Sequence, residues 1–474
     1  MSIARFGKML AMWAVLAAAF LVASASAESK ARIVRLSEVQ GTVQIDRTTG
    51  DGFDKAFINL PVIEGSKLKT GQDGRAEVEF EDGSSLRLAH DSEIDFSGLA
   101  LGDDGQKLTT VQLVSGTVYV NLHPKKSGEK NGDQFQLNFA QESVSVSEAA
   151  HFRLELDGTH RAMLAVFKGK VSATSPSGQF EIAEKHSATV NFSRDDRAKD
   201  DGANDGLASD DQANRDHARK DTFVIAKNYE TESSDAWDRQ QTDYHDRYAS
   251  VGGSSAGLSS ASLSSRYGYG LSDLNYYGSF TTMPGYGNVW QPYFIGANWS
   301  PFQDGGWAFY PGSGYTFVSG YPWGWMPYRS GNWVFIPGFG WVWQPGNWNS
   351  FNALPVAVNT PVKFKAPTVP ASGHQTVMMG LGLAANPATG APHHLTIKPG
   401  SAGFGVPRGS VSHLDRVAKT MNRTDRPVVV ATVSPVSTMS PTTGFGAGPS
   451  LGPSTSTGML ATPHRSAAPA SRPH

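Results

Sequence analysis

The side chains best suited to chemistry in this sequence are a run of carboxylates. Glu77, Glu79 and Glu81 alternate with the apolar residues of 76–80. Two neighbouring carboxylates can act as general acid and base in hydrolysis. Alternate positions of a strand face the same side, so we interpret the acidic stripe as a solvated face opposite an apolar one.

The remaining polar residues do not assemble into a known site. The histidines are scattered, and none stands at a metal-ligand spacing with a supporting carboxylate on a predicted helix. No nucleophile elbow, zinc-protease, phosphate-loop or dinucleotide-binding motif appears in context. The chain has no cysteine, which excludes disulfides and thiolate chemistry. We therefore expect no catalytic, cofactor-binding or metal-binding residue, and a protein that is not an enzyme.

The most informative feature is an aromatic repeat. Nine of the eleven tryptophans lie at positions 290–348, among glycines and prolines. Residues 299–315 align without a gap with residues 325–341, an offset of 26 residues. This period predicts small β units that stack and bury most of their rings. The alternative is a surface on which sugar rings of cell-wall glycan stack, with four candidate residues: Trp299, Trp323, Trp325 and Trp343.

The N-terminus predicts export. Arg5 and Lys8 precede an apolar run at 9–23, and the small residues 24–27 form a cleavage site. Residues 1–27 are therefore predicted to be a signal peptide, which places the rest in the periplasm or at the cell surface of a bacterium. An uncleaved anchor is the alternative, because residues 9–27 are just long enough to span a bilayer. A net charge of −2 gives no global attraction for nucleic acid.

Residues 31–192 alternate between apolar and polar side chains in many short runs, which predicts strands. The dipeptides at 82–83 and 157–158 are Asp-Gly, a pair that favours tight hairpin turns. We expect a mainly β protein whose first domain is an antiparallel β sandwich or jelly roll.

The rest of the chain divides by composition. Residues 193–221 are predicted to be a charged linker, disordered in part, and residues 250–270 a flexible spacer. Between them, residues 222–249 are predicted to form one helix, with Tyr229, Trp237, Tyr244 and Tyr248 on one face. A repeat domain of short strands follows at 271–350. Residues 351–474 are rich in Pro, Ala, Ser, Thr and Gly and are predicted to be a basic, disordered tail.

Two segments resemble known families. The phrases at 65–71, 75–84, 86–90, 111–118 and 165–171 resemble the FecR domain, the periplasmic portion of regulators that relay envelope signals to sigma factors. The chain departs from that family at Ala149-Ala150-His151-Phe152, where a Gly-Thr pair is usual. The phrases at 273–278, 285–292, 323–328 and 338–345 resemble DUF6600, a Trp-rich family with no established activity.

The resemblance implies a regulator, but the N-terminus argues against direct contact with a sigma factor. Only eight residues precede the apolar run, too few to bury the roughly 800 Å² that each partner contributes to a stable interface. We therefore expect an exported, non-enzymatic envelope protein that binds or scaffolds at the cell wall or surface. Its partner would be cell-wall glycan or another envelope protein. The alternative is a signal-receiving component that acts through a partner membrane protein.

Overall fold

The computed structural model describes residues 32–102, 106–123, 133–158, 161–175, 178–192, 222–249, 270–311, 314–346, 377–379 and 394–432. The predicted signal peptide, the linker 193–221 and the spacer up to residue 269 lie outside these residues. Within the described part of the chain, no helix is both long and apolar enough to span a membrane.

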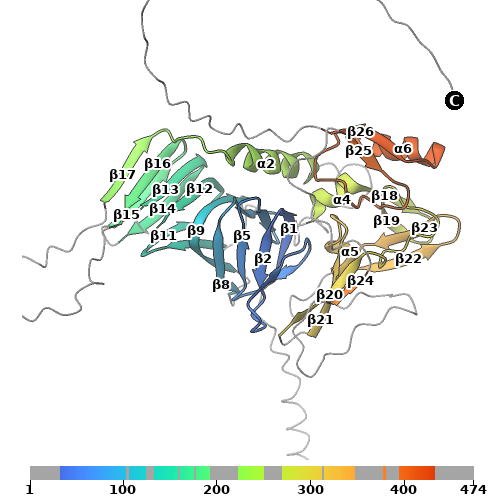
Figure 1. Ribbon diagram of the computed structural model, residues 1–474, viewed down its shortest axis with the longest axis horizontal. Coiled ribbons are helices and arrows are strands. Elements are labelled where there is room, and N and C mark those ends of the chain that lie inside the picture. The colour runs from blue at the N-terminus through green and yellow to red at the C-terminus, as the bar shows by residue number, and fades with distance from the viewer. Residues whose placement is uncertain are drawn as a thin grey trace, which may run out of the picture. The chain divides into compact units, whose positions relative to one another are not determined.

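Two sheets that share one long strand, β9 (Lys107–Leu122), form the first domain (Figure 1). We call it the β domain. In spatial order, the first sheet is β3 (Phe53–Lys55), β2 (Val43–Asp46), β5 (Lys67–Thr70), β8 (Glu93–Leu101), β9, β10 (Gln134–Phe139), β11 (Glu142–Val146), β14 (Lys170–Ser175) and β15 (Gly178–Ala183). The second sheet is β4 (Pro61–Val62), β1 (Val34–Gln40), β6 (Arg75–Glu79), β7 (Ser85–Leu88), β9, β12 (Ala150–Asp157), β13 (Arg161–Lys168), β16 (His186–Asn191) and β17 (Thr222–Lys227). The prediction of a mainly β fold is confirmed.

Strand β9 passes from one sheet to the other at Gly116. This glycine has a φ of +82°, and a side chain there would meet Ser92 Oγ at 2.4 Å and Asp91 O at 2.5 Å. Only glycine combines that backbone conformation with so close an approach. The residues before Gly116 pair with β8 and β10, and those after it pair with β7 and β12. Gly116 therefore lets one strand join both sheets.

The alternation of apolar and polar residues along the strands shows which face of the second sheet forms the core. Val78, Leu86, Val120 and Phe152 are paired neighbours across the second sheet, and all four are fully buried. Their side chains face the first sheet, because alternate residues of a strand point to opposite faces. Along each strand, the residues on either side of these four face outward. This outer face carries the predicted acidic stripe, which the structure does not leave in solvent.

The Trp-rich domain is built from three β hairpins, and each corresponds to one copy of the repeat. They are β18 (Gly278–Met283) with β19 (Gly287–Pro292), β20 (Gly305–Tyr310) with β21 (Gly314–Ser319), and β22 (Asn332–Ile336) with β23 (Gly340–Gln344). The first and third hairpins share a sheet, because Trp290 of β19 pairs with Trp343 of β23. The second hairpin pairs instead with β24 (Val377–Met379). Short helices α4 (Leu271–Tyr277) and α5 (Met326–Arg329) precede the first and third hairpins.

The tryptophans of the repeat pack in the interior rather than forming a stacking surface. Trp323 is fully buried, with its ring centroid 4.8 Å from that of Trp290 and 5.9 Å from that of Trp333. The indole N–H of Trp323 donates to Ala402 O at 2.7 Å, so the polar edge is also satisfied. All four candidates for glycan stacking are buried: Trp299, Trp323, Trp325 and Trp343. Each is at most 5% exposed and leaves no open ring face for a sugar, which contradicts the stacking prediction for these residues.

Two boundaries predicted for the rest of the chain are also wrong. Residues 222–227 form strand β17, and the helix α2 begins only at residue 235 (Asp235–Ala249). The predicted disordered tail contains a folded segment, residues 394–432, with β25 (His394–Ile397), α6 (Leu414–Thr424) and β26 (Val428–Ala431). We call it the C-terminal segment. Several of its apolar residues, such as Leu414 and Met421, are buried, although the overall composition of the tail predicted disorder.

We expect Trp323→Ala to lower the free energy of unfolding by about 3–5 kcal/mol, the usual effect of removing a large buried ring. Phe335→Ala is the matched control, because Phe335 lies in the same repeat but is 53% exposed. Urea unfolding followed by circular dichroism measures both. Equal losses for the two variants would contradict the assignment of Trp323 to the core.

Candidate functional site

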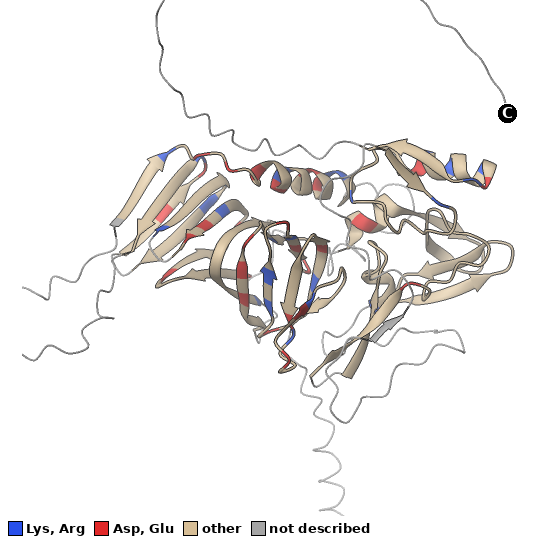
Figure 2. Ribbon diagram, in the orientation of Figure 1, with Lys and Arg blue, Asp and Glu red and all other residues tan. Residues whose placement is uncertain are grey.

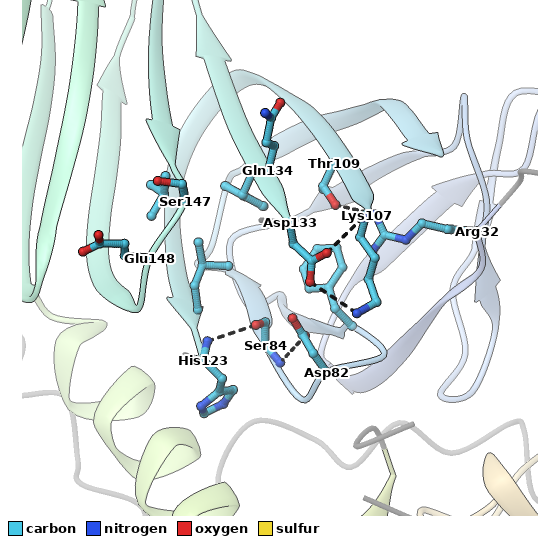
Figure 3. Close-up of a pocket in the computed structure, with 14 residues that line it drawn as sticks. Arg32, Asp82, Ser84, Lys107, Thr109, His123, Asp133, Gln134, Ser147 and Glu148 are labelled. Carbon is cyan, nitrogen blue, oxygen red and sulfur yellow. Dashed lines mark hydrogen bonds and ion pairs between the residues drawn. The ribbon is translucent and has the colours of Figure 1, made fainter. Parts of the chain in front are cut away.

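A small pocket in the β domain is the first place to look for chemistry (Figure 3). Its cavity measures about 50 Å³, room for a few water molecules only. The Arg32 guanidinium binds both carboxylate oxygens of Glu81, at 2.8 and 2.7 Å. Lys107 Nζ lies 3.3 Å from Asp133 Oδ2. Burial lowers the pKa of His123, which also lines the pocket. These four charges are paired with one another, and a cavity of this size has no room for a substrate.

A larger polar cluster lies on the outer face of the second sheet. Strand pairing aligns one residue from each of five neighbouring strands, and we call this set the polar row: Glu38, Glu77, Arg87, Tyr119 and Arg153. All five are buried. Figure 2 shows that charged residues are frequent on the β domain and on α2, and sparse on the Trp-rich hairpins. Burying ionised side chains is costly unless each is paired.

Helix α2 supplies partners to the polar row through a polar stripe. Asp235 accepts from Arg153 Nη1 at 2.5 Å and from the Tyr119 hydroxyl at 2.8 Å. Asp238 Oδ1 accepts from Arg87 Nη1 at 2.6 Å. The spacing of Asp235 and Asp238, continued by Gln241, Thr242 and His245, puts these residues on one side of a helix. The helix therefore docks by charge and hydrogen bonding, with Trp237 and Tyr244 as its buried aromatic residues.

Glu77 is the centre of the cluster. Its Oε2 accepts from Arg87 Nε at 2.8 Å, and its Oε1 accepts from Arg408 Nη1 at 2.6 Å and from the Ser37 hydroxyl at 2.7 Å. His245 Nε2 lies 2.9 Å from the same Oε1. Burial alone would favour the neutral acid, but the positive charges of His245, Arg408 and Arg87 outweigh it and hold the pKa of Glu77 well below its usual range. One carboxylate thus joins β1, β7, α2 and the C-terminal segment.

A second group of ions adjoins the first. Arg35 Nη1 lies 2.7 Å from Asp273 Oδ2 of α4 and 3.1 Å from Glu79 Oε2. Arg408 reaches Asp273 as well, with Nη2 at 3.1 Å from Oδ2. Burial raises the pKa of Glu79, and Arg35 offsets only part of that effect. For Asp273, the nearby Arg408 and Arg35 outweigh burial and lower the pKa. The same arginine of the C-terminal segment therefore binds carboxylates of both domains.

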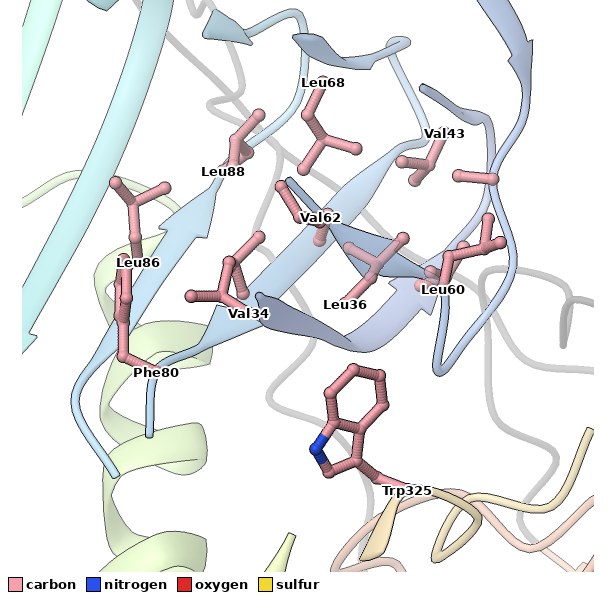
Figure 4. Close-up of a cluster of buried hydrophobic side chains, with 14 of the residues drawn as sticks. Val34, Leu36, Val43, Leu60, Val62, Leu68, Phe80, Leu86, Leu88 and Trp325 are labelled. Atoms are coloured by element: carbon pink, nitrogen blue, oxygen red, sulfur yellow. The ribbon is translucent and has the colours of Figure 1, made fainter. Parts of the chain in front are cut away.

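Beside these ions, the β domain and the Trp-rich domain contact each other directly. The Asn59 amide donates to Ser319 O at 3.0 Å and to Tyr321 O at 2.8 Å. Arg35 Nη2 donates to Pro322 O at 2.6 Å. Trp325 belongs to the same buried apolar cluster as Val34, Leu36 and Leu60 (Figure 4). Polar and apolar contacts together join the two domains in one interface.

The polar row and its partners hold segments of the chain together, but they do not present reactive groups. The acidic stripe predicted to be solvated is fully buried at Glu77, Glu79 and Glu81, because α2, α4 and the C-terminal segment cover Glu77 and Glu79, and Arg32 pairs with Glu81. Among the described residues, no group of three or more His, Asp or Glu side chains could hold a metal ion. The sequence interpretation missed the stripe on α2, although its spacing is visible. It also missed Arg408, for which no local pattern gives a signal.

Glu77→Gln is expected to lower the free energy of unfolding at pH 7 by about 3–5 kcal/mol, because it leaves buried cations without their counter-charge. The pKa of Glu77 is depressed in the folded state, so its contribution is present above the unfolded value of about 4.3 and is lost as pH falls below it. The difference between wild type and variant should therefore shrink between pH 7 and pH ~3.

Urea unfolding at several pH values measures this difference. Glu181→Gln is the control, since the Glu181 side chain is 62% exposed and pairs only with the exposed Lys170. We expect its effect to stay within about 0.5 kcal/mol. A Glu77→Gln variant no less stable than Glu181→Gln at pH 7 would contradict the role given to the polar row.

Comparison with known proteins agrees with the two-domain architecture. Residues 66–172 match the FecR protein family, and residues 271–366 match DUF6600, a family of unknown function. Two crystal structures of a "putative anti-sigma factor" from Parabacteroides distasonis ATCC 8503 are similar at 13% identity and a TM-score of 0.25, over 36% of this chain and 63% of that one. This chain thus covers less than two thirds of that protein, and at this TM-score the likeness carries no functional argument. No curated protein matches the sequence. The chain thus combines a segment that matches the FecR family with one that matches DUF6600, the two families that the sequence resembles.

Proposed function

We propose that this protein is a non-enzymatic, FecR-type regulatory component of the bacterial envelope, exported and acting through a partner protein. The observation that carries the proposal is the position of Glu77. This residue lies in the segment matched by the FecR family, and it binds both α2 and the C-terminal segment. A change in either covering segment must therefore alter contacts inside the FecR domain.

The electrostatics of the polar row support a structural rather than a catalytic role. An effective general acid or base has a pKa near the working pH. The pKa values of Glu77 and Asp238 are instead lowered: burial opposes ionisation, but Arg87 and a histidine next to each carboxylate outweigh it. These carboxylates stay ionised and paired, which suits a contact that holds two surfaces together and separates when its ions are rehydrated.

Coupling between the segments can be measured by amide hydrogen exchange. Arg408→Gln removes the cation that Glu77 and Asp273 share. We expect faster exchange in α2 and in β6 and β7, far from residue 408 in sequence, because Glu77 is left with fewer counter-charges. Arg416→Gln is the matched control, because Arg416 belongs to the same segment but is exposed. Exchange that rises only in the C-terminal segment would contradict the coupling.

The regulatory role predicts a transcriptional effect in the native bacterium. Deleting the gene should change the transcripts of a defined set of envelope genes, and wild-type protein or Arg416→Gln should restore them. The Arg408→Gln variant, expressed at an equal level, should not restore these transcripts. Mass spectrometry of the exported chain should give Glu28 as its first residue, which requires a partner to carry the signal across the membrane. A deletion that leaves transcription unchanged would sink the proposal.

A binding or scaffolding role is the second candidate, and an exposed aromatic patch favours it. The β22–β23 hairpin carries Phe335, 53% exposed, and Phe339, 40% exposed. The ring of Trp341 lies edge-on to Phe335 at 5.6 Å. Exposed aromatic side chains of this kind are common at protein-binding surfaces. In the deletion experiment, loss of an envelope protein's retention without a change in transcription would support this second role.

A further inference from the structure

Strand β17 ends the second sheet with an uncovered edge. Among the described residues it pairs only with β16, and Figure 1 places it at the end of the sheet. Val224 and Ile225 in its centre are 50% and 45% exposed. Exposed apolar edge strands are templates for pairing with another strand, and natural proteins usually protect them with charge, proline or a bulge. The central residues of β17 have none of these protections.

The apolar core is also open at this edge. Phe223 and Ile225 pair with Val190 and Ala188 of β16, and both of those residues are buried in the core. Phe223 and Ile225 therefore lie on the core side of the sheet. The ring of Phe223 stacks on Phe180 of the other sheet, with centroids 4.1 Å apart. Ile225 has no such cover and remains about half exposed. The sandwich thus ends with part of its core face uncovered.

The direction of the backbone hydrogen bonds shows which groups of β17 are free. Asn228 N donates to Lys185 O at 2.8 Å, just beyond the end of the β16–β17 pairing and in the same register. Residues of an antiparallel strand point their N–H and C=O groups alternately toward one neighbour and the other. Residues 224 and 226 therefore bond to β16, like residue 228. The backbone groups of Phe223, Ile225 and Lys227 point outward, where a further strand would bind.

We propose that β17 pairs with β17 of a second copy of this chain, antiparallel, about a two-fold axis at Val224. In this register Phe223 lies opposite Ile225 of the second copy, and Ile225 opposite its Phe223, so four backbone hydrogen bonds form and the open core faces adjoin.

The sequence of the strand selects this register and this partner. A shift of one residue would place outward-pointing backbone groups opposite inward-pointing ones. A shift of two residues in one direction would place Lys227 opposite Phe223, and in the other direction it would leave Ile225 with no residue of β17 opposite it. Only the register centred on Val224 places both Phe223 and Ile225 opposite an apolar residue of the second copy. The strand is therefore complementary to itself, as a two-fold interface requires.

A pairing of this length buries less than the roughly 1,200 Å² of a stable complex, so we expect a dimer that dissociates on dilution. Sedimentation of the full exported chain should show a reversible monomer–dimer equilibrium. Ile225→Lys puts a charge on the open core face and should shift it to monomer, with an unchanged circular dichroism spectrum. A wild-type chain that stays monomeric up to millimolar concentration would overturn the proposal.

Single cysteines test the register, because the chain has no cysteine of its own. Val224→Cys should form a disulfide-linked dimer on mild oxidation, since residues opposite each other in a non-hydrogen-bonded pair have Cα atoms about 4.5 Å apart. Ala226→Cys is the matched control on the same strand and face. In the proposed register its two copies lie about 13 Å apart along the strand, too far for a disulfide.

Cross-linking at Ala226→Cys but not at Val224→Cys would overturn the register. A wild-type strand that pairs only with a strand of another envelope protein would overturn the choice of a second copy.

Discussion

The structure depends on a buried carboxylate that carries its charge in the interior. Glu77 is removed from water between a sheet and a helix, and it stays ionised only because Arg87, Arg408 and His245 surround it. The free energy lost in removing these ions from water is regained only when all of them are present. The sheet face, α2 and the C-terminal segment therefore form a mutually dependent set, in which each segment supplies charges that the others need.

The parts of the fold that could be predicted from sequence are those governed by local periodicity. Alternation at 76–80 located a strand and its core side correctly, and the Asp-Gly pairs located two hairpins. The outer face could not be predicted from the same alternation. A row of polar side chains reads as solvated unless its cover is known, and the cover comes from segments far away in sequence, one of them 331 residues from Glu77.

The structure of the aromatic repeat could likewise be predicted only in part, because some of its contacts are made by residues far away in sequence. Its period predicted small stacked β units, and the structure has three of them, each a hairpin. The period could not show that the first and third units pair with each other while the second joins a different strand. Nor could it show which rings are buried, because Trp323 bonds to Ala402 and Trp325 lies in the same buried cluster as Val34, all outside the repeat. Helix α2 was placed too early because β17, with Val224 and Ile225, is apolar enough to suit either structure.

The distance in sequence between Glu77 and Arg408 has a consequence for how the chain acquires its structure. The strands of the FecR domain leave the ribosome long before residue 408 does. Until then Glu77 lacks one of its cations, and the outer sheet face cannot adopt its final form. Contacts of such high sequence separation form slowly. We therefore expect the FecR domain to complete its folding only after the whole described chain has been released, so that a chain interrupted upstream would remain a substrate for chaperones and proteases.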